Sequence, residues 1–401
     1  MSISAMIGEA VLFSVISALL GAAGGHAVLQ RMPRDLRHTA FVPQIRPARQ
    51  TVSRRRTLMS AGVPDIPPEA SQIQEQAAKD LLEDIRGVTL TVPPSICPQQ
   101  TLQATYVQLH GDDDDKQERR DPPVVLLHGF DSSVLEFRRF VPFLREAGVR
   151  GWIVDIHGWG FGQLDGGCDF SAESKRLMLY EFWRQVVGER AVFVGSSLGG
   201  SIALDVAAEH PECVDKLLLI APQATMEGLG PLSSLPDIIG RLGIRVLGSV
   251  PLRQFANQLA YYDKERLATT DAMRVGRLHT LRRGWEDASL SFQKSGGFAV
   301  KAKLSRVNCD VQLVWGANDQ ILPPESAHDV LEALQPHTRS ARLAFIDQCG
   351  HLPHLEKPHV LIDHFRDFLR PRQINGDRRR GARQDKDQVK TTSVEGSRVV
   401  G

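Results

Sequence analysis

The sequence has few cysteines and no excess of charge of either sign. Its five cysteines, Cys97, Cys168, Cys213, Cys309 and Cys349, lie far apart and form no Cys-x-x-Cys pair. This pattern argues against a disulfide framework or a zinc site and favours reduced thiols inside a cell. The 48 basic and 47 acidic residues leave a net charge of +1, whereas nucleic-acid-binding proteins usually show a basic excess. We therefore expect no metal and no nucleic-acid partner.

The sequence also lacks a long hydrophobic run. The apolar segment Ala10–Ala23 has 14 residues, fewer than the roughly 20 that a membrane-spanning helix needs, and it resembles the apolar part of a signal peptide. Residues 31–60 contain eight arginines and a single acid, Asp35, as is typical of transit peptides. Together they resemble the two-part leader of plastids acquired by secondary endosymbiosis, so we expect residues 1–65 to direct the chain to a plastid. A mitochondrial presequence, an N-terminal membrane anchor and a solvated tail are the alternatives.

Between the leader and residue 371, short apolar runs alternate with amphipathic segments. The expected strands are Val88–Val92, Leu102–Leu109, Val124–Leu127, Gly151–Asp155, Ala191–Val194, Lys216–Ile220 and Val311–Trp315. The expected helices are a short one capped by Ser71, then Phe137–Ala147, Ser171–Val187 and Leu198–His210. Continuous apolar strands separated by helices predict an α/β fold with a mostly parallel sheet that helices cover on both faces.

Residues 223–300 interrupt this alternation with repeated Gly and Pro, leucine-rich stretches and several aromatic residues. We interpret them as a mostly helical insertion over the carboxyl edge of the sheet, with apolar surface that could contact lipid or a membrane. The run Asp112–Asp115 lacks the ligand spacing of a calcium loop, so we expect an exposed turn there. The predicted segments are residues 1–65 (leader), 66–98 (linker and short helix), 99–222 (first part of the core), 223–300 (helical insertion), 301–371 (second part of the core) and 372–401 (disordered charged tail).

A nucleophile motif joins one of the buried strands to a helix. The sequence GSSLG at residues 195–199 directly follows the strand 191–194. A serine needs a base and a freely accessible oxygen to act as a nucleophile, and a sharp strand-to-helix turn requires small residues at both ends. The spacing makes Ser197 the nucleophile and Ser196 a hydrogen-bonding neighbour. A tight turn without chemistry is the alternative.

The partners of Ser197 are expected in the chain order Ser, Asp, His. Asp319 lies in the loop after the strand 311–315, and His351 follows later. Asp319 would hold the imidazole in the tautomer that accepts the serine proton. His354 competes as the base, but a helix is expected to begin directly after it, so we expect it to face away. Cys349 competes as the nucleophile, but we interpret it as a small residue packed in the loop.

The negative charge that develops on a carbonyl oxygen needs two backbone donors. One is expected to be the amide of Leu198, at the start of the helix that follows the nucleophile. The other is expected from the loop after the strand 124–127, where the amide of Phe130 is the candidate. Both assignments rest on position along the chain.

Residues 100–370 resemble the α/β-hydrolase superfamily in four places and in the right order: HGF at 128–130, GWG at 158–160, GSSLGG at 195–200, and GAND at 316–319 with CGHLPHLEKP at 349–358. The run PVVLLHGF at 123–130 is similar to plastid-targeted members. The resemblance implies an α/β-hydrolase fold, a lid formed by the insertion, and hydrolysis through an acyl-serine intermediate. Haloalkane dehalogenases and most epoxide hydrolases of this fold carry Asp as nucleophile, so Ser197 favours an ester or a related carbonyl compound.

These observations predict a serine hydrolase without a cofactor that cleaves a hydrophobic carboxylic ester or a related acyl compound. Two alternatives use the same fold and stay open. One is a receptor that senses a small molecule with an intact triad. The other is an acyltransferase or a haloperoxidase-like enzyme that uses the same three residues.

Overall fold

The computed structural model describes residues 64–110, 121–165, 167–225 and 227–370. The predictions about the leader, the run Asp112–Asp115 and the charged tail fall on residues outside these ranges, apart from their few edge residues. Within the described ranges, no helix combines the length and the hydropathy needed to span a bilayer.

One sheet of eight strands forms the centre of the molecule, in the order β1-β2-β4-β3-β5-β6-β7-β8. The strands are β1 (Ile85–Thr91), β2 (Thr101–Gln108), β3 (Val124–Leu127), β4 (Gly151–Val154), β5 (Ala191–Ser196), β6 (Val214–Ile220), β7 (Asp310–Gly316) and β8 (Ser340–Ile346). β1 and β2 pair antiparallel with their neighbours, and the other six strands are parallel. The predicted parallel sheet is therefore confirmed.

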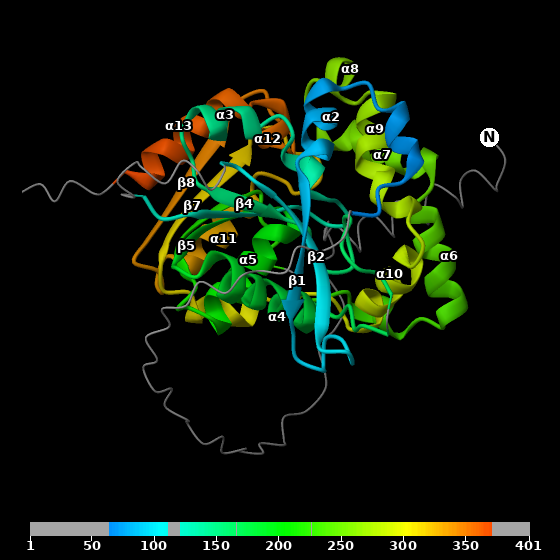
Figure 1. Ribbon diagram of the computed structural model, residues 1–401. Coiled ribbons are helices and arrows are strands. Elements are labelled where there is room, and N and C mark those ends of the chain that lie inside the picture. The colour runs from blue at the N-terminus through cyan, green and yellow to red at the C-terminus, as the bar shows by residue number, and fades with distance from the viewer. Residues whose placement is uncertain (1–63, 111–120, 166, 226, 371–401) are drawn as a thin grey trace, which may run out of the picture.

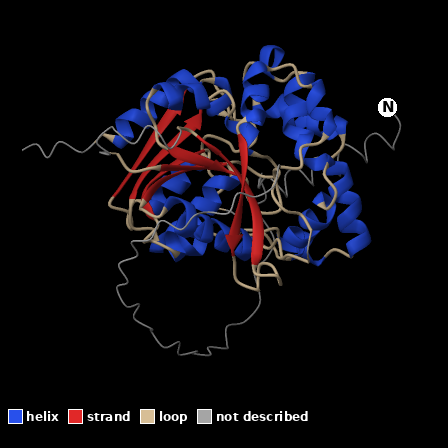
Figure 2. Cartoon of the chain, in the orientation of Figure 1, coloured by secondary structure: helices blue, strands red, loops and turns tan. Residues whose placement is uncertain are grey.

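Helices cover both faces of this sheet, as Figures 1 and 2 show. In β3, Val125 and Leu127 pack into the hydrophobic cluster on one face, while Val124 and Leu126 pack into the cluster on the other. Successive side chains of a strand point to opposite faces, so a strand with both faces buried reads as a continuous apolar run. The helices on the first face are α4 (Ala172–Phe182), α5 (Leu198–Glu209) and α11 (Ser326–Leu334); those on the second are α3 (Val141–Glu146) and α13 (Pro358–Leu369).

The insertion after β6 is helical, as expected, and lies beside one end of the sheet (Figure 1). Its α-helices are α6 (Asp237–Leu247), α7 (Val250–Ala260), α8 (Lys264–Leu267), α9 (Thr270–Arg277) and α10 (Trp285–Lys294), with the 3-10 turn η6 (Leu278–Leu281) before α10. We call this group of helices the lid. The amide of His351, which follows the last strand of the sheet, donates a hydrogen bond to Ala260 O of the lid at 2.8 Å. The lid therefore covers the carboxyl ends of the parallel strands.

Some local predictions differ from the structure. Ser71 does not cap a helix, because its Oγ donates to Pro68 O and α2 (Gln76–Glu83) starts later. The helix expected at 137–147 is shorter in the structure, where α3 begins at Val141 after the 3-10 turn η3 (Val134–Phe137). β8 was not expected. β1 corresponds to the strand expected at Val88–Val92 and begins three residues earlier, at Ile85.

The cysteine prediction is wrong for one pair. Cys97 and Cys168 form a disulfide, whereas the sequence favoured reduced thiols. The two residues are 71 positions apart and lie in different loops. The fold brings these loops together, as the hydrogen bond from Asp169 N to Ile96 O at 2.8 Å shows, and cysteine spacing carries no signal of such a pairing.

Candidate active site

Ser197 lies in the turn between β5 and α5, with backbone angles φ 50° and ψ −116°. The two glycines that flank it in the motif, Gly195 and Gly199, have no room for a side chain. A Cβ on Gly195 would clash with Gly199 O, and one on Gly199 would clash with Leu127 O. The positive φ of a non-glycine residue costs conformational energy and is a mark of functional sites. The small residues of the motif are thus required by close backbone packing.

Asp319 and His351 come together at the same sheet edge as Ser197. The three residues follow the carboxyl ends of the parallel strands β7, β8 and β5, respectively. His351 Nδ1 lies 2.7 Å from Asp319 Oδ2, and both residues are buried. Asp319 Oδ1 accepts hydrogen bonds from the amides of Ile321 and Leu322 at 2.8 and 2.9 Å. The carboxylate is therefore fixed by its own loop and oriented toward the imidazole.

The Ser197 side chain is not hydrogen-bonded to this pair. Among the described residues, the hydrogen bonds at Ser197 involve its backbone, and its Oγ has no partner. Catalytic hydrogen bonds often tighten only when a substrate is bound, so the contact between serine and imidazole stays a prediction. The prediction for Ser196 is wrong: its Oγ is buried and makes no hydrogen bond in the described part of the chain.

The two competitors for these roles are placed elsewhere. His354 is fully buried, its ring lies 5.0 Å from that of Phe137, and its Nε2 is 3.3 Å from Glu136 Oε1. Glu136 in turn accepts the amide of Gly129 at 3.0 and 3.1 Å. Burial raises the pKa of Glu136, but His354 outweighs this and lowers it to about 2.

The competing nucleophile, Cys349, is also buried. Burial raises the pKa of the Cys349 thiol, which disfavours the thiolate needed for attack.

Phe130 and Leu198 place two backbone amides next to the serine. A Cβ on Gly129 would lie 3.5 Å from Ser197 Cβ, so the loop that carries Phe130 touches the nucleophile. In the described part of the chain neither the Phe130 amide nor the Leu198 amide donates to a protein acceptor. His128 Nδ1 donates to Gly129 O at 2.9 Å, and burial lowers the pKa of this histidine. A neutral, buried imidazole therefore supports the loop.

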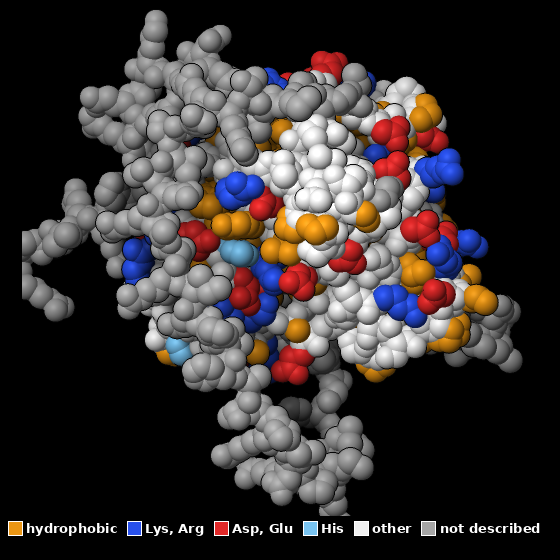
Figure 3. Space-filling model, turned by 60° about the horizontal axis from the view of Figure 1, so that its bottom comes forward, with side chains coloured by type: hydrophobic (Ala, Val, Ile, Leu, Met, Phe, Trp, Pro, Cys, Tyr) orange, Lys and Arg blue, Asp and Glu red, His pale blue; other side chains and the backbone are white. Residues whose placement is uncertain are grey.

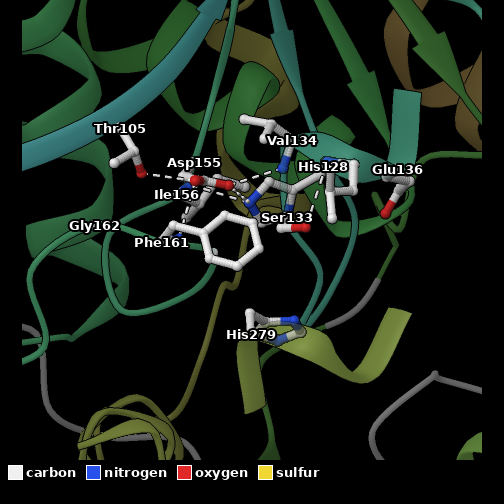
Figure 4. Close-up of polar contacts among 12 residues, drawn as sticks. Thr105, His128, Ser133, Val134, Glu136, Asp155, Ile156, Phe161, Gly162 and His279 are labelled. Atoms are coloured by element: carbon white, nitrogen blue, oxygen red, sulfur yellow. Dashed lines mark hydrogen bonds and ion pairs between the residues drawn. The ribbon is translucent and has the colours of Figure 1, made fainter. Parts of the chain in front are cut away.

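A third buried carboxylate, Asp155, fixes the base of the same loop (Figure 4). Asp155 follows β4 and accepts hydrogen bonds from Thr105 Oγ1 at 2.6 Å, Val134 N at 2.8 Å and Phe161 N at 3.0 Å. Gly160, with φ 67°, packs on the carboxylate so closely that a Cβ would overlap it. The glycine-rich turn after β4 therefore wraps a structural carboxylate.

Three elements of the lid bind Asp131, the residue that follows Phe130. Asp131 is buried, and its carboxylate is bound by Arg253 of α7, by His279 Nε2 of η6 at 3.0 Å and by Trp285 Nε1 of α10 at 2.7 Å. Arg253 also donates to Asp131 O at 3.1 Å. Burial raises the pKa of Asp131, but the neighbouring arginine and histidine outweigh it and hold the pKa well below its usual range. One carboxylate thus connects three lid elements to the loop with the predicted oxyanion donor.

A narrow apolar pocket adjoins both predicted oxyanion residues. It is lined by Phe130, Leu198, Gln223, Gly228, Leu229, Phe292 and Phe298. Leu229, Phe292 and Phe298 come from the insertion, Phe292 from α10 of the lid and the other two from the segments on either side of it, so the insertion supplies one wall of the pocket. A pocket of this composition suits an apolar group attached to a carbonyl carbon near Ser197.

A buried lysine lies behind this wall. Lys175 Nζ is 3.9 Å from the ring centre of Trp159 and 5.0 Å from that of Phe292, and it donates to His157 O. Burial lowers the pKa of Lys175 to about 7, although two nearby carboxylates oppose this. The amine is enclosed by rings and a carbonyl, so it positions the aromatic wall and is not exposed to the pocket.

Sequence reasoning missed Asp131, Glu136 and Asp155. A weak signal was available for Asp131 and Asp155, because each is an acid directly beside a recognised motif or strand. Their partners lie far along the chain, so only the tertiary contacts reveal their roles. No group of three or more metal-ligating side chains is found within the described ranges.

The comparisons agree with this geometry. Residues 124–364 match the alpha/beta hydrolase family. A relative from Arabidopsis thaliana, the alpha/beta hydrolase domain-containing protein VTE7, is 36% identical over 308 residues, covering 76% of this chain and 89% of its own. The chain belongs to the alpha/beta hydrolase family.

Other relatives extend this result. The pimeloyl-[acyl-carrier protein] methyl ester esterase of Aromatoleum aromaticum is 30% identical over 60% of this chain and 97% of its own. A probable hydrolytic enzyme from Pseudomonas aeruginosa superposes with a TM-score of 0.59 at 17% identity, covering 72% of this chain and 94% of its own. A thermophilic esterase from Thermogutta terrifontis gives a TM-score of 0.57 at 18% identity, with 71% and 97% covered. The family and its named members identify this chain as an enzyme of the hydrolase class.

Proposed function

We propose that this protein is a serine hydrolase that cleaves a hydrophobic carboxylic ester through an acyl-serine intermediate. The observation that carries the proposal is the 2.7 Å contact between His351 Nδ1 and Asp319 Oδ2 at the sheet edge that also presents Ser197. A carboxylate on Nδ1 leaves Nε2 as the proton acceptor, which is the tautomer that general-base catalysis needs.

In the proposed first step, Ser197 Oγ attacks the ester carbonyl carbon and its proton passes to His351 Nε2. The carbonyl oxygen becomes an oxyanion that accepts hydrogen bonds from the amides of Phe130 and Leu198. The tetrahedral intermediate then collapses: the bond to the alcohol oxygen breaks, and His351 returns the proton to the leaving alcohol. An acyl group remains on Ser197.

In the second step, a water molecule gives a proton to His351 Nε2 and attacks the acyl-serine. Collapse of the second intermediate breaks the bond to Ser197 Oγ, which recovers the proton, and a carboxylic acid leaves. The apolar pocket beside Phe130 and Leu198 favours a hydrophobic acyl group. The names of the esterase relatives support an ester as the class of substrate.

A fluorophosphonate probe tests the nucleophile directly, because it reacts with activated serines. We expect the wild-type protein to be labelled on Ser197 and Ser197→Ala to remain unlabelled. Ser196→Ala is the matched control, since Ser196 is the adjacent serine and its Oγ has no hydrogen-bond partner among the described residues. Labelling of Ser197→Ala at the wild-type rate, or no labelling of the wild type, would contradict the proposal.

Turnover assays separate the alternatives. A series of p-nitrophenyl esters with acyl chains of graded length should be hydrolysed, and the preferred length measures how far the apolar pocket beside Phe130 and Leu198 admits the acyl group. Faster release of the chromophore when an acceptor alcohol is added would instead indicate an acyltransferase. Probe labelling without hydrolysis of any ester would favour a ligand receptor.

We further propose that residues 1–65 direct the protein to a plastid. The proposal rests on the eight arginines and single acid of residues 31–60 and on the apolar segment before them. The relative from a plant is compatible with it. A fusion of residues 1–65 to a fluorescent protein should accumulate in plastids; accumulation in mitochondria or in cellular membranes would show that the address is different.

A further inference from the structure

Helix α6 of the lid exposes apolar side chains in place of polar ones. Ile238, Leu242 and Val246 lie four residues apart, and 84%, 63% and 41% of their respective surfaces are exposed. The opposite side of the helix is packed, since a Cβ on Gly240 would lie 2.9 Å from Leu290 of α10. Residues four apart share one face of a helix, so α6 presents a continuous apolar stripe outward. We call Ile238, Leu242 and Val246 the α6 stripe.

A pocket rich in arginine opens beside the end of this stripe. It has a volume of about 290 Å³, and Arg245, Arg277 and Arg282 are among the residues that line it. Glu286 is the one carboxylate in its wall, and that group is already bound by Arg241 and Arg245. Asp65 is the second carboxylate near the pocket, 3.5 Å from Arg282 Nε, so three guanidinium groups face two carboxylates and the pocket keeps an excess of positive charge.

Two of the guanidinium groups are held in place by backbone carbonyls and keep nitrogen atoms that have no acceptor in the described part of the chain. Arg277 Nε donates to Gly248 O at 2.7 Å, and in the described part of the chain its terminal nitrogens have no acceptor. Arg282 has a side chain that is 6% exposed, its Nη1 donates to Gly160 O and Gly162 O, and its Nε lies 3.5 Å from Asp65 Oδ2, which leaves Nη2 without an acceptor in the described part of the chain. Burial lowers the pKa of Arg282, although Asp65 opposes this. Fixed guanidinium groups of this kind are suited to bidentate binding of phosphate oxygens.

We propose that the α6 stripe and the arginine pocket together form a docking surface for a bilayer that contains anionic phospholipid. The stripe would enter the acyl-chain boundary, and the pocket would take a lipid phosphate. Arg245 belongs both to α6 and to the pocket, so the apolar and the cationic features are continuous. Figure 3 shows hydrophobic and charged side chains mixed along the edge of the molecule where Figure 1 places α6.

Charge complementarity selects this partner over a second copy of the chain. A two-fold dimer buries the same patch of both subunits, so it would bring two cationic pockets together. An anionic bilayer instead offers phosphate to the arginines and hydrocarbon to the stripe. The inference does not depend on the proposed ester chemistry.

Co-sedimentation of the full-length chain with vesicles tests the proposal. The vesicles are phosphatidylcholine alone or phosphatidylcholine with phosphatidylglycerol. We expect Leu242→Glu to bind both kinds at least tenfold more weakly than wild type. We expect Arg277→Gln to bind the anionic vesicles about fivefold more weakly, which is roughly what one cation contributes at such a surface, and the neutral vesicles unchanged. Arg245→Gln should also weaken binding to the anionic vesicles alone. Arg245 is more exposed than Arg277, and its replacement keeps the hydrogen bond from Arg277 to Gly248.

Phe345→Glu and Arg366→Gln are the matched controls, because the first also replaces an exposed apolar side chain by a carboxylate and the second also replaces an arginine by glutamine, at exposed positions of β8 and α13. Both should bind like wild type. Wild-type binding by Leu242→Glu would overturn the proposal and assign vesicle binding to another segment of the chain. A change of oligomeric state in Leu242→Glu, measured by light scattering, would assign the stripe to a second copy. If Arg245→Gln and Arg277→Gln weaken binding of inorganic phosphate but not of anionic vesicles, the pocket takes a soluble anion and the proposal fails.

Discussion

The two sides of the candidate active site are held in different ways. On the sheet side, Asp319 is fixed by the amides of Ile321 and Leu322, which are two and three residues away in the chain. On the lid side, Asp131 is fixed by Arg253, His279 and Trp285, which are more than 100 residues away. The first arrangement is a local turn, whereas the second exists only when the lid is docked.

This difference assigns separate tasks to the two sides. The sheet side sets the protonation and the orientation of the groups that react, because Asp319 is fixed by amides of its own loop and contacts the buried His351 directly. The lid side sets the apolar pocket and secures the loop that carries Phe130. We therefore expect sheet-side variants to change the rate for all substrates alike, and lid-side variants to change stability or selectivity.

The largest effect is expected for Asp319→Asn. The amide would favour the wrong tautomer of His351, so kcat should fall by about 10⁴-fold while the fold stays intact. Steady-state kinetics with two esters of different chain length measure this. Asp347→Asn, an exposed acid near the same edge, is the control. A loss that depends on chain length would show that Asp319 also contributes to selectivity.

The next effect is expected for Asp131→Ala. It leaves the half-buried Arg253 without its ion-pair partner and removes the acceptor of His279 and Trp285. Breaking a buried pair typically costs about 3–5 kcal/mol of unfolding free energy, so we expect a loss toward the lower end of this range. Urea denaturation measures the change, with Asp363→Ala on the exposed side of α13 as the control. If Asp131→Ala unfolds at the same urea concentration as wild type, the contact with the lid does not stabilise the fold.

Acid should lower the free energy of unfolding by protonating the buried Glu136. The folded-state pKa of Glu136 is about 2, below the ordinary value of 4.5. Its contribution is therefore complete above pH 4.5 and is lost as the pH falls from 4.5 toward 2, by about 3 kcal/mol in unfolding free energy. Glu136→Gln should lose this part of the pH dependence, and Glu332→Gln at an exposed position should retain it. Equal acid profiles for Glu136→Gln and wild type would contradict the assignment.

The smallest effect is expected for Phe298→Leu in the pocket wall. A smaller side chain lengthens the pocket, so the ratio of kcat/KM for long over short acyl esters should rise by roughly tenfold. Phe345→Leu, on the exposed edge of the sheet, should leave the ratio unchanged. A uniform change for all chain lengths would place Phe298 outside the acyl-binding surface.

Much of the sheet could be predicted because its strands are buried on both faces, as at Val124–Leu127 and Ala191–Val194. β8 was not predicted because it is an edge strand whose residues are mostly half-exposed, so it lacks a continuous apolar run. The disulfide between Cys97 and Cys168 was not predicted because it joins loops that only the folded sheet brings together.

The sequence by itself determined the strand-turn-helix around Ser197, since close packing of the neighbouring backbone demands small residues at fixed spacings. It also indicated the chain order of Ser197, Asp319 and His351, because Ser197 and Asp319 follow apolar strands and a histidine comes later, in the order that the motif requires. Only the tertiary structure decided which carboxylates support the site and how the lid is attached. Asp131 and Glu136 take their roles from partners distant in the chain, and long-range contacts of single polar residues leave no periodic pattern in the sequence.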